Sequence, residues 1–133
     1  MASELKVNTL TGVSTAGSIA VTGEGNSTTT NLQQGLAKTW SYFDDGQNLL
    51  DSFNVSTLTD INTAKYSTTN TNNFSSVNYC WYGVSGIEGG IGYNAISPTA
   101  SNTTSTISMI TWVYNGASVD RDFNTICAMG DLA

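Results

Sequence analysis

The sequence predicts an all-β protein in which an extended N-terminal arm precedes a β-sandwich or jelly-roll-like knob. Two observations support this fold class. Thr, Ser, Asn and Gly are abundant while charged residues make up only 11% of the chain, and Thr suits a pleated sheet whereas Asn and Gly suit turns. Short apolar runs also recur at regular spacing over roughly the last 100 residues, as in all-β domains. The total of 133 residues is the size of one ordinary domain.

Residues 1–35 differ from the rest and are expected to form the arm. Leu5 and Val7 alternate with polar residues within Ser3–Leu10, and a second short alternation follows at Ile19–Val21. No aromatic residue occurs before position 36, so this segment cannot bury enough apolar surface to offset its ordering entropy. It either stays mobile or adds strands to the sheet edge of another chain, and the alternation favours strand addition.

Residues 36–133 are expected to form the knob, and its first strand is expected at Leu36–Phe43. Alternation there places Trp40 and Tyr42 on one face, as in a half-buried strand. The following Asp-Asp-Gly at positions 44–46 is typical of a turn.

The remaining strands follow the same reasoning. Ser52–Leu58 places Phe53 and Val55 on one face, and Ala64–Thr69 is expected to return as the second arm of a hairpin. The run Val77–Val84 carries bulky residues on both faces, which indicates cover by a second sheet or by a neighbouring subunit. Further strands are expected at Ile91–Ile96, Thr104–Asn115 and Phe123–Met129.

The charge distribution argues against two classes of partner. The formal net charge is −6 and the cations are four isolated residues, Lys6, Lys38, Lys65 and Arg121. Nucleic-acid binding needs clustered Lys and Arg, and so does adhesion to an anionic membrane surface. No apolar run approaches the ~20 residues that span a bilayer, and the first residues lack a secretory signal pattern. We therefore expect no nucleic-acid partner, no membrane partner and assembly in a cytoplasm.

The residues needed for catalysis or metal binding are missing, so we expect a protein that is not an enzyme and uses no cofactor or metal. The chain has no histidine and two cysteines, Cys80 and Cys127, which excludes the usual general base and the usual zinc ligand sets. We interpret the cysteines as two buried thiols, with a disulfide between neighbouring strands as the alternative. Among carboxylate pairs, Asp44-Asp45 fits a turn and Asp120-Arg121-Asp122 fits a solvated loop.

A set of residues in and near the richest strand is open to two interpretations. Val77, Tyr79, Trp81, Tyr82 and Tyr93 are candidates for a subunit interface, because aromatic residues dominate cores and interfaces. The alternative is a sugar-stacking surface that binds a glycan.

Several stretches in the same order resemble one family. They are MASELKVNTL at the start, GLAKTWSYFDD from Gly35, DSFNVSTLTD from Asp51, NYCWYGV from Asn78 and AMGDLA at the end. Together the chain resembles short structural or fibre-like virion proteins of tailed bacteriophages of the marine, cyanophage type. Residues after Gly86, including the Thr/Asn-rich stretch from Pro98 to Ser105, carry no part of this resemblance.

The resemblance implies a component of the virion surface that assembles in the host cytoplasm. The arm is expected to attach to the particle, and the knob to form a homotrimer beside other virion proteins such as the major capsid protein. Because the chain lacks a long repeating shaft, we favour a capsid decoration protein or head-fibre knob; the alternative is a tail fibre or receptor-binding module that recognises a host surface glycan. The expected virion-anchoring residues are Glu4, Leu5, Lys6, Val7, Asn8, Thr9 and Leu10.

Overall fold

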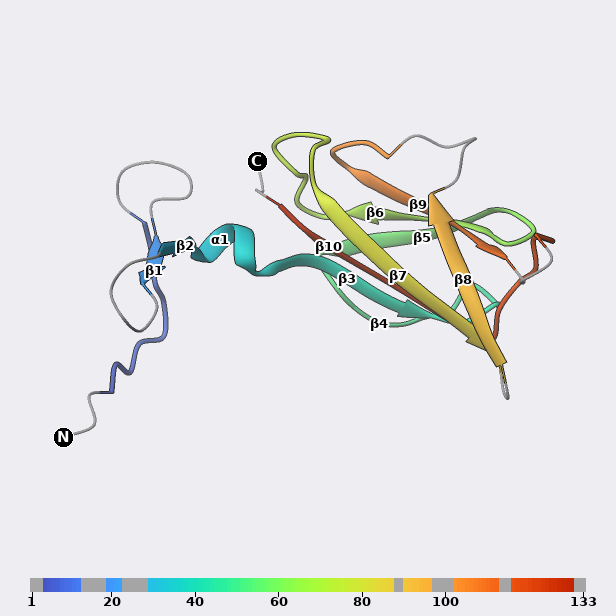
Figure 1. Ribbon diagram of the computed structural model, residues 1–133, viewed down its shortest axis with the longest axis horizontal. Helices are drawn as coiled ribbons and strands as arrows, with labels where there is room; N and C mark the ends of the chain where they lie inside the picture. Colours follow the sequence, from blue (N-terminus) through green and yellow to red (C-terminus); the bar gives the residue numbers. More distant parts are fainter. Residues whose placement is uncertain are drawn as a thin grey trace.

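The computed structural model describes residues 4–12, 19–22, 29–87, 90–96, 102–112 and 116–130. Nearly all of its regular structure is β-strand, which confirms the all-β prediction (Figure 1). The one helix within these ranges is a single turn. In chain order the elements are β1 Ala20–Thr22, β2 Thr29–Asn31, α1 Leu32–Gly35, β3 Ala37–Phe43, β4 Leu49–Phe53, β5 Val55–Asn62, β6 Lys65–Asn70, β7 Cys80–Ile87, β8 Gly90–Ile96, β9 Thr106–Trp112 and β10 Phe123–Met129.

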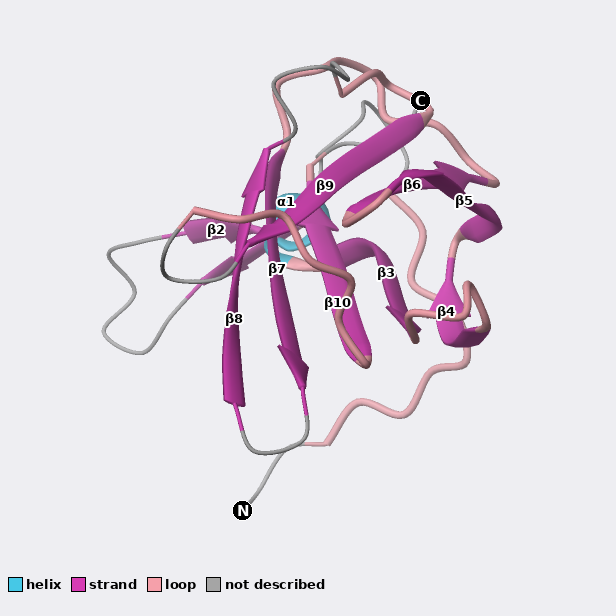
Figure 2. Ribbon diagram, turned by 90° about the vertical axis from the view of Figure 1, so that its right-hand side faces the viewer, coloured by secondary structure: helices cyan, strands magenta, loops and turns pink. Residues whose placement is uncertain are grey.

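Eight of the strands form one continuous sheet in the order β4-β3-β10-β7-β8-β9-β6-β5. Every neighbouring pair in it is antiparallel. The sheet curves, so that the β4-β3-β10-β7 half and the β9-β6-β5 half lie on opposite sides of the core and are joined through β8 (Figure 2). The last strand in chain order, β10, lies between β3 and β7 in the middle of one half.

The core lies between the two halves of the curved sheet. Phe43 from β3 meets Tyr66 from β6 edge-on, with 5.2 Å between ring centroids. Ile107 from β9 and Ile126 from β10 are also buried in this cluster, together with Met109. Since each of these side chains leaves water completely, each contributes roughly 2 kcal/mol of burial free energy. Packing across the core is therefore what holds the two halves together.

A second aromatic contact closes one end of the core. The rings of Phe74 and Tyr79 stack with 4.2 Å between centroids, and a Cβ on Gly130 would come within 2.8 Å of Tyr79 Cβ. The Tyr79 hydroxyl donates to the carbonyl oxygens of Thr103, at 2.9 Å, and Thr106, at 3.2 Å. This contact ties the chain before β7 to the start of β9.

The two end strands of the sheet are consecutive in the chain and meet at Asn54. Ser52–Leu58 was expected to be one strand, but the chain turns at Asn54, whose backbone φ is 58°. Asn54 Nδ2 donates to the carbonyl oxygens of Lys38 and Asn72, both at 3.0 Å, and Asn54 Oδ1 accepts from the Asn72 amide at 2.7 Å. Asn tolerates this left-handed conformation better than most residues. The single-strand prediction was therefore wrong, because a residue suited to a sharp corner divides the run.

The other strand predictions fit the structure closely. Phe123–Met129 coincides with β10, and the strand expected at Leu36–Phe43 begins one residue later. The hairpin expected around Ala64–Thr69 is confirmed by the antiparallel pairing of β5 with β6. The run Val77–Val84 was placed a few residues too early, since β7 begins at Cys80.

The described residues of the N-terminal segment share no sheet with the knob. The alternation at Ile19–Val21 overlaps β1, and β1 pairs only with β2 in a separate two-stranded sheet. Residues 4–12 are exposed and contain no strand. Figure 1 shows β1, β2 and α1 leading from this segment to the start of β3.

Candidate interaction surface

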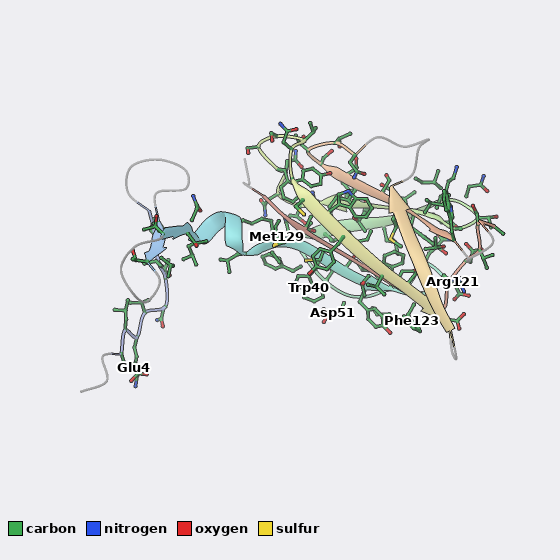
Figure 3. The ribbon with its side chains drawn as sticks, viewed as in Figure 1. Glu4, Trp40, Asp51, Arg121, Phe123 and Met129 are labelled. Atoms are coloured by element: carbon green, nitrogen blue, oxygen red, sulfur yellow. The ribbon has the colours of Figure 1, made fainter. Side chains whose placement is uncertain are left out.

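The outer face of the β4-β3-β10-β7 half carries cross-strand rows of apolar side chains. One row runs from Phe53 through Trp40 and Cys127 to Tyr82. The next row runs through Tyr42, Thr125 and Val84, and beyond it Phe123 lies opposite Gly86. Figure 3 shows Trp40 and Phe123 on this part of the sheet. We call the following six side chains the aromatic face: Trp40, Tyr42, Phe53, Tyr82, Val84 and Phe123.

The side chains of the aromatic face are open to solvent. Their exposed fractions run from 36% for Trp40 to 56% for Tyr82. With roughly 200 Å² per large side chain, the six together expose on the order of 500 Å². A contiguous apolar patch of this size on a single chain commonly marks an interaction site.

Local sequence explains why the aromatic residues of β3 point outward. Along β3, Thr39, Ser41 and Phe43 are buried while Trp40 and Tyr42 are exposed. The strand still alternates with period two. Phe43 is inside because it completes the core against Tyr66, and this fixes the two other aromatic residues of β3 on the outer face. The inner face next to them is filled by small hydroxyl side chains.

A glycine allows Phe123 to lie flat against the neighbouring strand. A Cβ built on Gly86 would approach ring atoms of Phe123 to 2.3 and 2.4 Å, so the ring occupies the space that a side chain on Gly86 would take. Glycine in a strand often marks such a close approach. The ring thus extends the aromatic face over the glycine backbone of β7.

Both cysteines lie on this face as free thiols. Cys127 is half-buried in the row that contains Tyr82, while Cys80 is exposed and pairs with Met129. The pKa of Tyr82 is raised first by a hydrogen bond with the Cys127 side chain and then by the negative charge of the Cys127 thiolate. The expectation of two buried thiols was therefore wrong for Cys80, because its position in β7 has the same outward direction as Tyr82 and Val84.

The aromatic face carries little charge. Asp51, opposite Tyr42, is the charged residue in the described cross-strand rows, and it lies in the end strand β4. Of the three knob cations, Lys38 and Arg121 are buried and Lys65 is half-buried on β6. In the arm, Lys6 forms an exposed ion pair with Glu4 at 3.4 Å, and such pairs contribute little to stability. Most exposed charge is therefore acidic and lies outside the aromatic face.

The segment Asp120–Asp122 matches the predicted solvated loop only in part, since both aspartates are exposed while Arg121 between them is buried. Arg121 is only 3% exposed, and its guanidinium donates to the Trp112 carbonyl oxygen at 3.3 Å. Asp120 Oδ1 accepts from the Ala64 amide at 2.6 Å and from the Tyr66 hydroxyl at 3.0 Å. Desolvation, followed by this contact with Asp120, raises the pKa of Tyr66. The segment is a structural tie between the β5–β6 turn and β10.

The five interface or glycan candidates predicted from sequence do not form one surface. Tyr82 lies on the aromatic face, whereas Tyr79 and Trp81 pack against the core cluster. Val77 is exposed in the segment before β7. Tyr93 lies in β8 opposite Trp112, and its side chain falls outside the described part of the structure.

The sequence analysis missed Phe53, Val84 and Phe123 as site residues and did not single out Trp40 and Tyr42. These side chains come from four strands, and only the strand order brings them together. The alternation around Trp40 was the one available signal, but alternation does not reveal which side of a strand faces water.

The expected virion-anchoring residues are all in the exposed N-terminal segment. Glu4 to Leu10 are each exposed, with Leu5, Val7 and Leu10 as the large apolar side chains among them (Figure 3 labels Glu4). More than half of the surface of each of these three apolar side chains is open to solvent.

Within the described ranges, no group of three or more His, Cys, Asp or Glu side chains is arranged to hold a metal ion. The same part of the chain contains no helix long and apolar enough to cross a membrane. No protein-family model, curated protein or solved structure matches the chain. The aromatic face and the exposed arm are thus the two features from which a function can be argued.

Proposed function

We propose that this protein is a non-enzymatic structural subunit of a bacteriophage virion, a capsid decoration protein or head-fibre knob. The observation that carries the proposal is the contrast between the two parts of the chain. Residues 4–12 are exposed and contain no strand, and they carry apolar side chains, whereas the eight-stranded unit has its own core. An arm of this kind gains order by adding to another protein.

In this proposal the arm, through Glu4 to Leu10, attaches the subunit to the particle, and the β-sandwich-like knob projects from it as a homotrimer. The resemblance of the ordered sequence motifs to short virion proteins of tailed bacteriophages supports this assignment. The acidic surface also fits a partner that is a protein, since no exposed cationic cluster is available for phosphate groups.

The first test is the copy number of the protein in purified virions, measured by quantitative mass spectrometry and normalised to the major capsid protein. A decoration or knob subunit should be present at an abundance comparable to the capsid protein. An abundance typical of a tail-ring component would instead favour a tail fibre, and absence from purified particles would refute the proposal.

The anchoring role of the arm is tested in the full-length chain. Replacing both Leu5 and Val7 by Asn removes the apolar side of the arm and should abolish binding to empty capsids while the knob stays folded. The control is Thr11→Asn, at an exposed position beside the anchoring residues and outside them, which should bind normally. Equal binding by both variants would refute the anchor assignment.

The second candidate is a tail fibre or receptor-binding module that recognises a host surface glycan. The exposed rings of Trp40, Tyr42 and Tyr82 favour it, because flat aromatic side chains stack on sugar rings. Trp40→Ala should then abolish binding in a screen of host surface glycans. Trp81 is unsuitable for this test, since it packs against the core. Failure of the unmodified protein to bind any host glycan would count against this candidate.

A further inference from the structure

We infer that the aromatic face is the surface through which copies of this chain associate, and that association covers both cysteine thiols. The inference deepens the proposed function by assigning the residues of the homotypic contact, and it rests on that proposal only for its biological setting. The surface itself is defined by the outer side of β4, β3, β10 and β7.

The first argument is area. The aromatic face exposes on the order of 500 Å² of large side chains. Outward-facing Thr125, Cys127 and Met129 lie in or beside the same rows and are half-buried, so they add on the order of 100 Å², and the face exceeds the roughly 500 Å² per partner of the smallest specific interfaces. The face is thus large enough for a specific protein contact without any contribution from the arm.

The second argument is charge. A chain with a net charge of −6 repels its own copies unless they meet through a neutral surface. The aromatic face is such a surface, since Asp51 is the charged residue in its described rows and lies in the end strand β4. At that border its carboxylate can stay hydrated when two faces meet. A basic partner would instead be directed to the acidic surface elsewhere.

The third argument is the state of the polar groups on the face. Thr125 Oγ1 donates to the Val84 carbonyl oxygen at 3.2 Å and accepts from the Val84 amide at 3.2 Å. Asp51 Oδ1 accepts from the Ser52 amide at 2.8 Å. A sugar needs directional hydrogen bonds beside its stacking contacts, and the Thr125 hydroxyl and Asp51 Oδ1 are already engaged. A second pleated sheet needs none, because two sheets pack through interdigitated apolar side chains.

The experiment uses the full-length protein and two matched variants. Val84→Glu places a carboxylate within the aromatic face, and Ile61→Glu places one on β5 at the opposite end of the sheet order. The two β-branched residues have similar exposed fractions, 54% and 49%, so their effects on folding should be alike. Analytical ultracentrifugation over a range of concentrations gives the mass and dissociation constant, and far-UV circular dichroism checks folding.

We expect the unmodified protein to be a multimer at micromolar concentration. Val84→Glu should raise the dissociation constant by about 100-fold or more, since an unpaired charge would be buried in the contact. Ile61→Glu should leave the constant unchanged. If Val84→Glu does not fold, Tyr82→Ala replaces it, with an expected rise of at least about tenfold. A dimer or a trimer supports the inference, provided that the face variants dissociate it.

The two thiols provide an independent measurement. The chain has only these two cysteines, so the rate of reaction with Ellman's reagent reports directly on this face. Above the dissociation constant the exposed thiol of Cys80 should react at least about tenfold more slowly than in the dilute protein, and Val84→Glu should remove the protection.

Three results would overturn the inference: a monomer at every concentration, equal dissociation of the two Glu variants, or thiol rates that do not depend on concentration. A monomer that binds an insoluble polysaccharide through Trp40 would show that a glycan occupies the face. These outcomes are distinct from failure of the virion proposal, which is decided by particle composition and not by the mass of the protein in solution.

Discussion

The corner at Asn54 provides the sharpest test of how this fold is held together. Its side chain makes the contacts with Lys38 and Asn72 described above, across the junction of β4 and β5. Its backbone adopts φ 58°. The sequence therefore meets two requirements at one position, a left-handed backbone and a side chain with both a donor and an acceptor.

The two requirements can be separated by substitution. Asn54→Gly keeps the backbone conformation and removes the side-chain bonds; at about 1 kcal/mol of net stability for each, reduced by partial exposure, the loss should be about 2–3 kcal/mol. Asn54→Ala removes the same bonds and adds the left-handed cost of a Cβ, about 1 kcal/mol more. The assay is urea unfolding followed by tryptophan fluorescence, with free energies from linear extrapolation.

The control is Asn73→Ala, an exposed asparagine in the connection between β6 and β7, which should change the unfolding free energy by less than about 0.5 kcal/mol. If Asn54→Gly were as stable as the unmodified protein, the side-chain bonds would contribute nothing. If the Ala and Gly variants were equally stable, the backbone argument would fail.

Three further predictions concern single contacts. Gly86→Ala should cost about 1–3 kcal/mol in urea unfolding because its Cβ meets the Phe123 ring, and adding Phe123→Ala should recover part of the loss. Asp120→Ala should cost about 2 kcal/mol by removing the acceptor of the Tyr66 hydroxyl and of a turn amide, whereas Asp120→Asn should keep most of the stability. Burial raises the pKa of Tyr79 to about 12. An unfolded tyrosine ionises near pH 10, so stability should be complete below about pH 10 and fall as the pH rises towards 12; Tyr79→Phe should make that fall shallower.

The outcomes that would contradict these three predictions are equally specific. For the glycine, a double variant no more stable than Gly86→Ala would mean that the ring is not what the new Cβ meets. For the carboxylate, equal losses from Ala and Asn would show that its hydrogen bonds do not matter. For the tyrosine, the unfolding free energy of Tyr79→Phe in urea titrations could fall between pH 8 and pH 11 as steeply as that of the unmodified protein. That result would show that ionisation of Tyr79 does not cause the fall.

Strand positions were predictable from the sequence to the extent that they depend on local pattern. Phe123–Met129 is a short, mostly apolar run that coincides with β10, where β7 pairs along its whole length and β3 pairs from Asn124 to Met129. The corner at Asn54 was missed because alternation continues across it, and a single Asn between apolar residues looks like an outward position. Strand order depends on contacts between distant segments, which periodicity does not encode.

The site was harder to predict than the fold. Tyr82 was singled out and does lie on the aromatic face, but Trp81, its neighbour, packs on the other side of the same strand. Trp40 and Tyr42 have the spacing of a buried face, yet Phe43 takes the inner position. Apolar side chains repeat every two residues along a strand whether their face is exposed or buried. Only the neighbouring strands determine which of the two faces is buried.

The central position of β10 has a consequence for synthesis of the protein. Because this last strand pairs with both β3 and β7, the β4–β3 hairpin has no other sheet neighbour until it arrives. At a ribosome adding about 5–20 residues per second, the nascent chain therefore exposes the unpaired edges of β3 and β7 until Phe123–Met129 has emerged. A chain that terminates before this segment keeps those edges and cannot close the core around Ile126, so only copies translated through Met129 become competent to assemble.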